Sequence, residues 1–273
     1  MIEPMRPLTI SELLDRTFSI YRNHWLTFVG IAAIPNSVLL GLNLVSTLVL
    51  FTDSTLALST WFTGLSMLIT LIVFVVASML TQGATTIAVS QVQLGQPAGI
   101  GDAFASMRGR TTELIVLSLN VGVRVVFGLI LLVIPGLYLA LRYSLAMPVA
   151  VLEQPGSISK SIERSAELTQ GHFGRILLIY VLLVVLTVAA SAVWQLPVEW
   201  IVRQVRDTTD LVALTRWVTI FTAIGNFVVR SVVGPLMTIA FALIYYDERV
   251  RKEGFDLEHM LQQLEPSLTP PIA

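Results

Sequence analysis

Long runs of apolar residues that carry almost no charge dominate the chain. Residues 25–51 and 61–88 are the first two such runs, and a short loop, residues 53–59, joins them. About 20 apolar residues in a helix span the roughly 30 Å hydrocarbon core of a bilayer. Because 55% of the 273 residues are hydrophobic and only 13% are charged, the chain is too apolar for a soluble domain of this size. These features predict an all-α, polytopic integral membrane protein.

Hydropathy predicts six transmembrane helices arranged as three hairpins. After the first pair, the predicted crossings are residues 114–133, 137–152, 176–196 and about 222–246. Pro135-Gly136 predicts a tight turn inside the second hairpin, and Gly234-Pro235 predicts a kink in the last crossing. Residues 197–221, which include Trp200, are expected to lie along the membrane surface between the last two crossings.

A short polar pattern recurs between the apolar runs. Residues 158–165, followed by His172 and Phe173, resemble residues 10–17, followed by His24 and Trp25. Weaker copies occur at residues 96–104 and 256–261. We therefore predict a single membrane domain at residues 1–265. Its expected parts are pseudo-repeats at about 9–93, 97–152 and 155–255, a closing amphipathic helix at 256–265, and a tail at 266–273.

Each copy of the polar pattern predicts a short amphipathic helix. In the first copy, Thr9 and Glu12 have the spacing of a capping box. Helices of this kind lie in the plane of the membrane surface and bury their apolar face among the headgroups. The predicted membrane-interface residues are Leu14, Phe18, Phe104, Met107, Leu257 and Leu261. In the alternative interpretation, the first helix packs against the rest of the protein.

The placement of Lys and Arg predicts the orientation in the membrane. Eleven of the seventeen basic residues fall in the segments with the amphipathic helices, whereas the opposite loops hold only Arg203, Arg206 and Arg216. Cytoplasmic segments carry the excess of basic residues. Both termini and all the amphipathic helices are therefore expected on the cytoplasmic side of the membrane.

Three arginines lie inside predicted crossings. Asn120 precedes Arg124 by four residues, Asn226 precedes Arg230 by the same spacing, and Arg142 is the third cation. A central arginine costs about 3 kcal/mol on the lenient insertion scale, so such residues normally face a bundle interior or a watery cavity. The apolar parts of the crossings contain no Asp or Glu. These five residues are the candidate site for an anionic ligand. Alternatively, Arg142 and Arg230 extend to the interface and Arg124 bonds helix carbonyls.

Sequence motifs for catalysis or metal binding are weak. Ser157 and Lys160 match the Ser-x-x-Lys spacing of serine acyl-enzymes, but the companion motifs of those enzymes are missing. The chain has no cysteine, and its three histidines are far apart. We therefore expect no enzyme activity, no metal site and no cofactor.

Several longer motifs resemble a known family. They are Met5-Arg6-Pro7-Leu8, Leu14-Asp15-Arg16-Thr17-Phe18, Pro135-Gly136-Leu137-Tyr138, residues 142–148, residues 167–171 and residues 246–257. They are similar to the membrane domain of bacterial glycerophosphoryl diester phosphodiesterases, which implies a polytopic inner-membrane protein. In some members a catalytic barrel follows this domain. Fewer than thirty residues follow the last predicted crossing, so we expect this chain to lack that barrel.

Two functional hypotheses follow from the sequence. In the first, a non-catalytic membrane protein binds, and translocates, an anionic lipid or phosphorylated amphiphile through the intramembrane arginines. In the second, the cytoplasmic amphipathic helices make the protein a membrane scaffold or membrane-shaping protein. The expected partners are the lipid bilayer, an anionic lipid ligand, and a second copy or another membrane protein. No nucleic-acid partner is expected.

Overall fold

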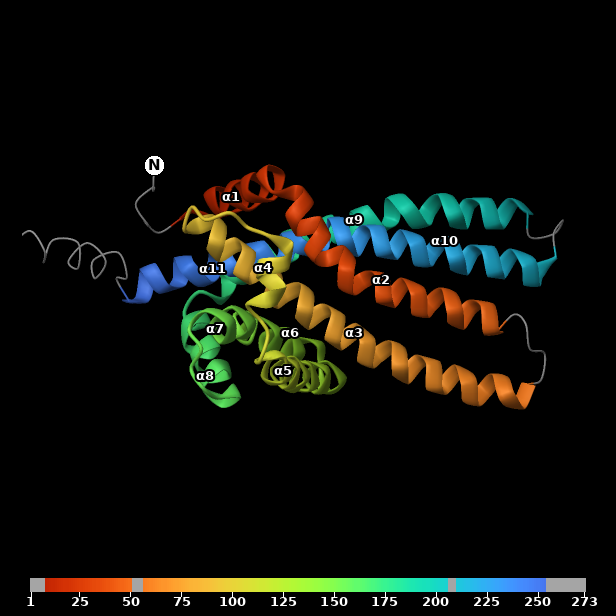
Figure 1. The fold of residues 1–273 in the computed structure, drawn as a ribbon, viewed down its shortest axis with the longest axis horizontal. Helices are drawn as coiled ribbons and strands as arrows, with labels where there is room; N and C mark the ends of the chain where they lie inside the picture. The colour runs from red at the N-terminus through yellow and green to blue at the C-terminus, as the bar shows by residue number, and fades with distance from the viewer. Residues whose placement is uncertain (1–7, 51–55, 206–209, 254–273) are drawn as a thin grey trace, which may run out of the picture.

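The computed structural model describes residues 8–50, 56–205 and 210–253, and within these ranges the regular secondary structure is helical (Figure 1). The helices are α1 (Ile10–Asn23), α2 (Trp25–Leu50), α3 (Leu56–Gln93), α4 (Ile100–Ala105), α5 (Thr111–Leu131), α6 (Val133–Arg142), α7 (Ala146–Leu152), α8 (Ile158–Thr169), α9 (Phe173–Val205), α10 (Leu211–Val232) and α11 (Gly234–Glu253).

Six segments among the described residues are long and apolar enough to cross a membrane. They are Trp25–Val49, Trp61–Gln93, Thr111–Leu131, Val133–Leu152, Phe173–Gln204 and Val212–Glu253. The prediction of an all-α membrane protein with six such segments is confirmed. The division into three pseudo-repeats stays a prediction, and the predicted closing helix, with Leu257 and Leu261, lies outside the described residues.

Four long helices form one layer along the long axis of the molecule, in the order α3, α2, α10 and α9 (Figure 1). The helices α1, α4, α7 and α8 gather at one end of this layer, which we call the short-helix end. α10 ends at Val232 and α11 continues from Gly234 into the short-helix end, so the predicted kink at Gly234-Pro235 is a break between two helices. α11 is the core of that end, because α1, α3, α8 and α9 all contact it.

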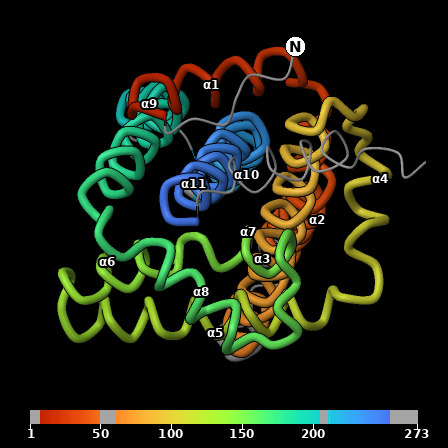
Figure 2. Tube along the Cα trace, turned by 90° about the vertical axis from the view of Figure 1, so that its left-hand side faces the viewer, coloured from red at the N-terminus to blue at the C-terminus, as the bar shows by residue number. Residues whose placement is uncertain are grey.

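The hairpin of α5 and α6 runs across the long axis instead of along it (Figure 2). Its reversal occurs at Leu132, which has an extended backbone, and not at Pro135-Gly136 as the sequence predicts. Pro135 lies in the first turn of α6, where a missing amide hydrogen costs little. Gly136 allows close packing between α5 and α6. A Cβ at Gly128 would lie only 2.9 Å from the Cα of Gly136. The two glycines let the arms touch.

The last two long helices also differ from the prediction. α9 continues through Pro197 to Val205, so Trp200 belongs to a long helix and not to a surface segment. The start of α10 is not a separate surface segment either, because α10 packs along α9. The indole Nε1 of Trp194 donates to the carbonyl of Phe221 at 2.9 Å. The fourth predicted crossing is interrupted as well, since α6 ends at Arg142 and α7 begins at Ala146.

α1 has the predicted capping box, in which the Thr9 side chain and the Glu12 side chain each accept from the other residue's backbone amide. Its inner face is buried within the protein through Leu13, Thr17 and Ile20. The packing of this face agrees with the alternative sequence interpretation, in which α1 docks on the rest of the protein. The outer face keeps an apolar group, because Phe18 is 44% exposed.

The other predicted interface residues occupy different environments. Leu14 and Phe104 are partly buried and pack against the core. Met107 is 3% exposed, because α4 ends at Ala105 and the following turn places the Met107 side chain against Gly83 of α3. Met107 is therefore a core residue and not a group at the membrane surface. The roles of Leu14, Phe18 and Phe104 at the interface stay predictions.

Candidate functional site

Two cavities lie end to end within the layer of long helices. The outer cavity has a volume of about 650 Å³ and is lined by α2, α3 and α10. The inner cavity, about 310 Å³, is nearer the short-helix end and adds residues of α7, α9 and α11 to its lining. Asn36, Phe74 and Arg230 line both cavities. These three residues therefore mark the place where the two cavities adjoin, and we call the two cavities together the cavity path.

Hydroxyl and amide groups line this path. They come from Asn36, Asn43, Ser46, Thr47, Thr63, Ser66, Thr70, Ser78, Thr81, Gln82, Thr86, Ser144, Thr187, Thr219, Asn226 and Thr238. Among the described residues that line the two cavities, Arg230 carries the charge and none is a carboxylate. The path therefore offers many neutral hydrogen-bonding groups around one cation.

Arg230 is the cation at the junction. Its guanidinium carbon lies 4.9 Å from the centre of the Phe74 ring, and no ion pair to Arg230 occurs within residues 8–50, 56–205 and 210–253. Asn226, one helical turn earlier, lines the outer cavity with it, as the four-residue spacing predicts. Both side chains are exposed to the open cavity. Arg230 can therefore meet an anion that enters from outside the chain.

The structure does not bring Arg124 to this site. Arg124 and Asn120 belong to α5, whose crosswise course separates them from α10, and neither lines the two cavities. The Arg124 guanidinium lies 5.8 Å from the centre of the Tyr143 ring. Arg142 lies 5.9 Å from the centre of the Tyr138 ring, at the base of the same hairpin. Of the predicted pairs, only Asn226 and Arg230 therefore face a common cavity.

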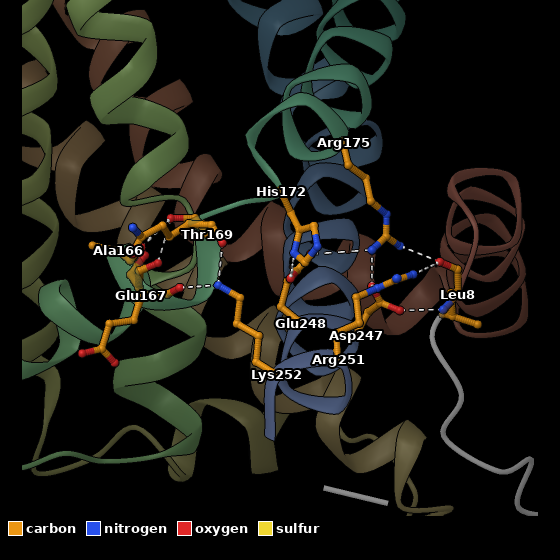
Figure 3. Close-up of polar contacts among 12 residues, drawn as sticks. Leu8, Ala166, Glu167, Thr169, His172, Arg175, Asp247, Glu248, Arg251 and Lys252 are labelled. Atoms are coloured by element: carbon orange, nitrogen blue, oxygen red, sulfur yellow. Dashed lines mark hydrogen bonds and ion pairs between the residues drawn. The ribbon is translucent and has the colours of Figure 1, made fainter. Parts of the chain in front are cut away.

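A second polar group surrounds two buried carboxylates of α11 (Figure 3). Asp247 forms ion pairs with Arg175 of α9 and, at 2.8 Å, with Arg251. It also accepts a 2.6 Å hydrogen bond from the backbone amide of Leu8, whose carbonyl accepts from both arginines. Glu248 lies 2.6 Å from Nδ1 of His172. We call these residues the α11 ionic cluster. It ties the N-terminal segment and the start of α9 to α11.

The charges at the end of α11 tie down α8 in the same way. Lys252 donates to the backbone carbonyls of Glu167 and Gln170, at the end of α8. Arg164 of α8 forms ion pairs with Glu253 and, at 3.2 Å, with Glu153. α8 is therefore fixed to α11 by charged groups as well as by packing.

Comparison with known protein families identifies the chain. Residues 114–267 match the family described as the membrane domain of glycerophosphoryl diester phosphodiesterase. The chain belongs to this family. No curated protein and no solved structure matches the chain. The family match includes Arg230 and the charged residues of the α11 ionic cluster, whereas Leu8 and α1 to α4, with Asn36 and Phe74, precede it.

Sequence reasoning missed the α11 ionic cluster, although residues 246–257 contribute to the resemblance to the membrane-domain family. The available signal was the density of charge directly after an apolar helix: Asp247, Glu248, Arg249, Arg251 and Lys252 follow each other within one and a half turns. Buried carboxylates almost always have ionic or hydrogen-bonding partners, so two acidic residues on the inner face of such a helix indicate a cluster.

The weak catalytic motif has a structural role. The Ser157 side chain caps α8 by accepting from the amide of Lys160. The buried Ser165 and Thr169, farther along α8, donate to the backbone carbonyl of Arg142 at 3.0 and 3.2 Å. No group of three metal-ligating side chains comes together in the part of the chain that the structure describes.

Proposed function

We propose that this member of the family is a non-catalytic membrane protein that binds an anionic lipid or phosphorylated amphiphile at Arg230, and that the headgroup moves along the two joined cavities. The observation that carries the proposal is the position of Arg230. It is a cation without an ionic partner among the described residues, placed where two polar cavities meet. The family description names an enzyme of glycerophosphoryl diesters, and such esters are anions.

The energetics favour an anionic headgroup over a neutral one. Arginine near the bilayer centre costs about 3 kcal/mol or more, and an anion that pairs with it offsets part of this cost. A phosphate can accept two parallel hydrogen bonds from the planar guanidinium, and such charge-assisted bonds are stronger in a low-dielectric site than at a wet surface. Thr81 and Gln82 of the inner cavity add neutral donors for the polar remainder of the headgroup.

The arrangement of the long helices supports access from the bilayer. α3 and α9 lie at the two edges of the layer and are not packed against each other, yet Phe74 of α3 and Thr187 of α9 both line the inner cavity. A lipid headgroup can therefore reach the cavity between these edges while its acyl chains stay among the lipids. The two cavities in line then provide a polar route along the helices.

The test compares lipid retention by matched arginine variants. We expect Arg230→Leu to lose the anionic lipid that native mass spectrometry detects on the wild-type protein in mild detergent, while the protein stays folded. Arg124→Leu is the control, because it also removes an arginine from an apolar helix but lies outside both cavities. Arg230→Lys keeps the charge and loses the planar fork, so we expect intermediate retention.

The outcomes separate a binding site from a structural arginine. Equal retention of lipid per folded molecule by Arg230→Leu and the wild type contradicts the proposal. Equal loss in Arg230→Leu and Arg124→Leu also contradicts it, because a general effect of arginine removal then explains the loss. Transport is tested by reconstituting the same variants in vesicles with a fluorescent anionic lipid on one leaflet, where movement that does not depend on Arg230 refutes the translocation step.

A further inference from the structure

The hairpin of α5 and α6 has a geometry that a membrane crossing does not explain. Both views show its arms running across the four long helices, close to the short-helix end (Figures 1 and 2). α6 has 10 residues, so it is about 15 Å long, roughly half of the hydrocarbon thickness. The chain then turns through Tyr143 to Leu145 and enters α7, which packs on α3 and α8. The returning arm is therefore too short to span the bilayer.

The tip of this hairpin is strongly apolar and uncovered. No charged residue occurs between Arg124 and Arg142. Ile130 at the end of α5 is 75% exposed, and Ile134 at the start of α6 is 81% exposed. Each fully exposed side chain of this size costs about 1.5–3 kcal/mol in water relative to an apolar environment. The tip therefore requires an apolar partner, and its surface continues the exposed apolar surface of a protein whose other helices face lipid.

The base of the hairpin has the composition of a membrane interface. Arg124 lies over the ring of Tyr143, and Arg142 lies over the ring of Tyr138, to whose hydroxyl it also donates at 3.4 Å. Tyrosines and arginines are typical of the headgroup level, where their apolar parts stay in the hydrocarbon and their polar ends reach water. The hairpin thus combines an apolar tip with a cationic, aromatic base, a composition that suits a segment lying within one leaflet close to the headgroup level.

We infer that the α5–α6 hairpin lies in the plane of one leaflet, across the long helices, with acyl chains covering its apolar tip and both arms at the membrane face of the short-helix end. The lipid chains of that leaflet are the partner of the exposed tip. The protein then crosses the bilayer four times, through α2, α3, α9 and the α10–α11 pair. This inference goes beyond the proposed headgroup site and does not depend on it.

Cysteine labelling tests the inference directly, because the natural chain has no cysteine. Ile134→Cys places a thiol at the tip, Lys160→Cys places one on α8, and Arg203→Cys places one near the opposite end of α9. We expect a membrane-impermeant maleimide to label the Lys160→Cys and Arg203→Cys proteins from opposite sides of sealed vesicles. The Ile134→Cys protein is expected to resist the reagent from both sides and to react after the membrane is dissolved.

Depth measurements give the second arm of the test. A fluorophore attached at Ile134→Cys is expected to be quenched by spin-labelled lipids in one leaflet, the one facing the Lys160 side. Labelling of Ile134→Cys from the Arg203 side means that the hairpin crosses the bilayer, and it overturns the inference. Labelling from the Lys160 side places the tip in water and also overturns it. Efficient disulfide cross-linking between two Ile134→Cys chains identifies a second copy as the partner instead of lipid.

Discussion

Two arginines of this protein illustrate how the groups around a cation decide its role. Arg175 at the start of α9 is satisfied by Asp247, by Glu248 at 3.6 Å and by the carbonyl of Leu8. Arg230 has the ring of Phe74 beside it and an open cavity in front of it. Removing a partner from the first group strands a buried charge, which costs about 3–5 kcal/mol. Among the described residues Arg230 has no ionic partner to lose, so its replacement by leucine is compatible with a stable fold.

Single residues also explain why the sequence predicts one half of the arginine site and not the other. The spacing of Asn226 and Arg230 fixes their shared face, because both lie on the same regular helix. Arg124 has the same spacing from Asn120, but spacing within a helix carries no information about the direction of that helix. The reversal at Leu132 and the contact between Gly128 and Gly136 set how α5 packs on α6, and both become visible only in three dimensions.

Gly225 provides a test of the packing between α9 and α10. A Cβ at this position would overlap the indole ring of Trp194. We expect Gly225→Ala to destabilise the protein by about 1–3 kcal/mol through overpacking, despite the better helix propensity of alanine. Thermal unfolding in detergent measures the effect.

Gly122→Ala is the matched control for Gly225, since a Cβ at Gly122 meets nothing within 4 Å. We expect this variant to be as stable as the wild type or slightly more stable. Equal unfolding temperatures for the two alanine variants would contradict the expected overpacking of Gly225→Ala against Trp194.

At the scale of helices, α11 is the helix on which α1, α7 and α8 pack at the short-helix end. α1 reaches it through packing, through Leu8 and through Tyr21, whose hydroxyl donates at 2.7 Å to the carbonyl of Val232 just before α11. Burial raises the pKa of Tyr21, which keeps this hydroxyl protonated as a donor. The sequence predicts α1 and its cap well because both depend on neighbouring residues. It does not predict the docking, because that depends on groups more than two hundred positions away.

The bond between Leu8 and Asp247 gives a test at this scale. Leu8→Pro removes the amide hydrogen that Asp247 accepts, whereas Leu8→Ala keeps it. We expect faster hydrogen exchange along α1 in the proline variant than in the alanine variant, because α1 loses its tie to α11. The alanine variant accounts for the lost packing of the leucine side chain. The same exchange rates in both variants would contradict a role for this hydrogen bond in docking α1.

For the whole molecule, hydropathy predicts which segments are apolar but not how they are directed. The predicted segments 25–51 and 61–88 become long helices of the layer over the residues that the structure describes, as α2 and α3. The segments 114–133 and 137–152 have similar composition and become a crosswise hairpin followed by α7. The sequence does not predict the lining of the inner cavity. Thr and Ser residues such as Thr81 and Ser78 are common in apolar helices, and only the fold brings them together.

The orientation of the molecule is open to a direct test. By the distribution of basic residues, we expect reporters fused at the N-terminus, near Gly99, near Gly156 and at the C-terminus to lie in the cytoplasm. A reporter near Arg203 is expected on the opposite side. Opposite locations for the reporters near Gly99 and Gly156 would contradict both the six-crossing prediction and the embedded hairpin. In both arrangements, residues 99 and 156 lie on the same side of the membrane.

The hydrogen bond between Leu8 and Asp247 joins residues 239 positions apart, and this separation has a consequence for biosynthesis. The ribosome completes α1 long before it makes α11, so the face with Leu13 and Ile20 has to wait for its partner. Meanwhile the membrane surface is the apolar environment within reach of an amphipathic helix. We therefore infer that the same apolar face of α1 has two successive partners. It contacts the lipid headgroup region during synthesis and packs against α11 in the completed protein. Photo-cross-linking from a probe at position 13 tests this order. We expect lipid adducts while the chain is still bound to the ribosome, and adducts to α11 after the chain is released. The absence of lipid adducts at both stages would exclude the inference.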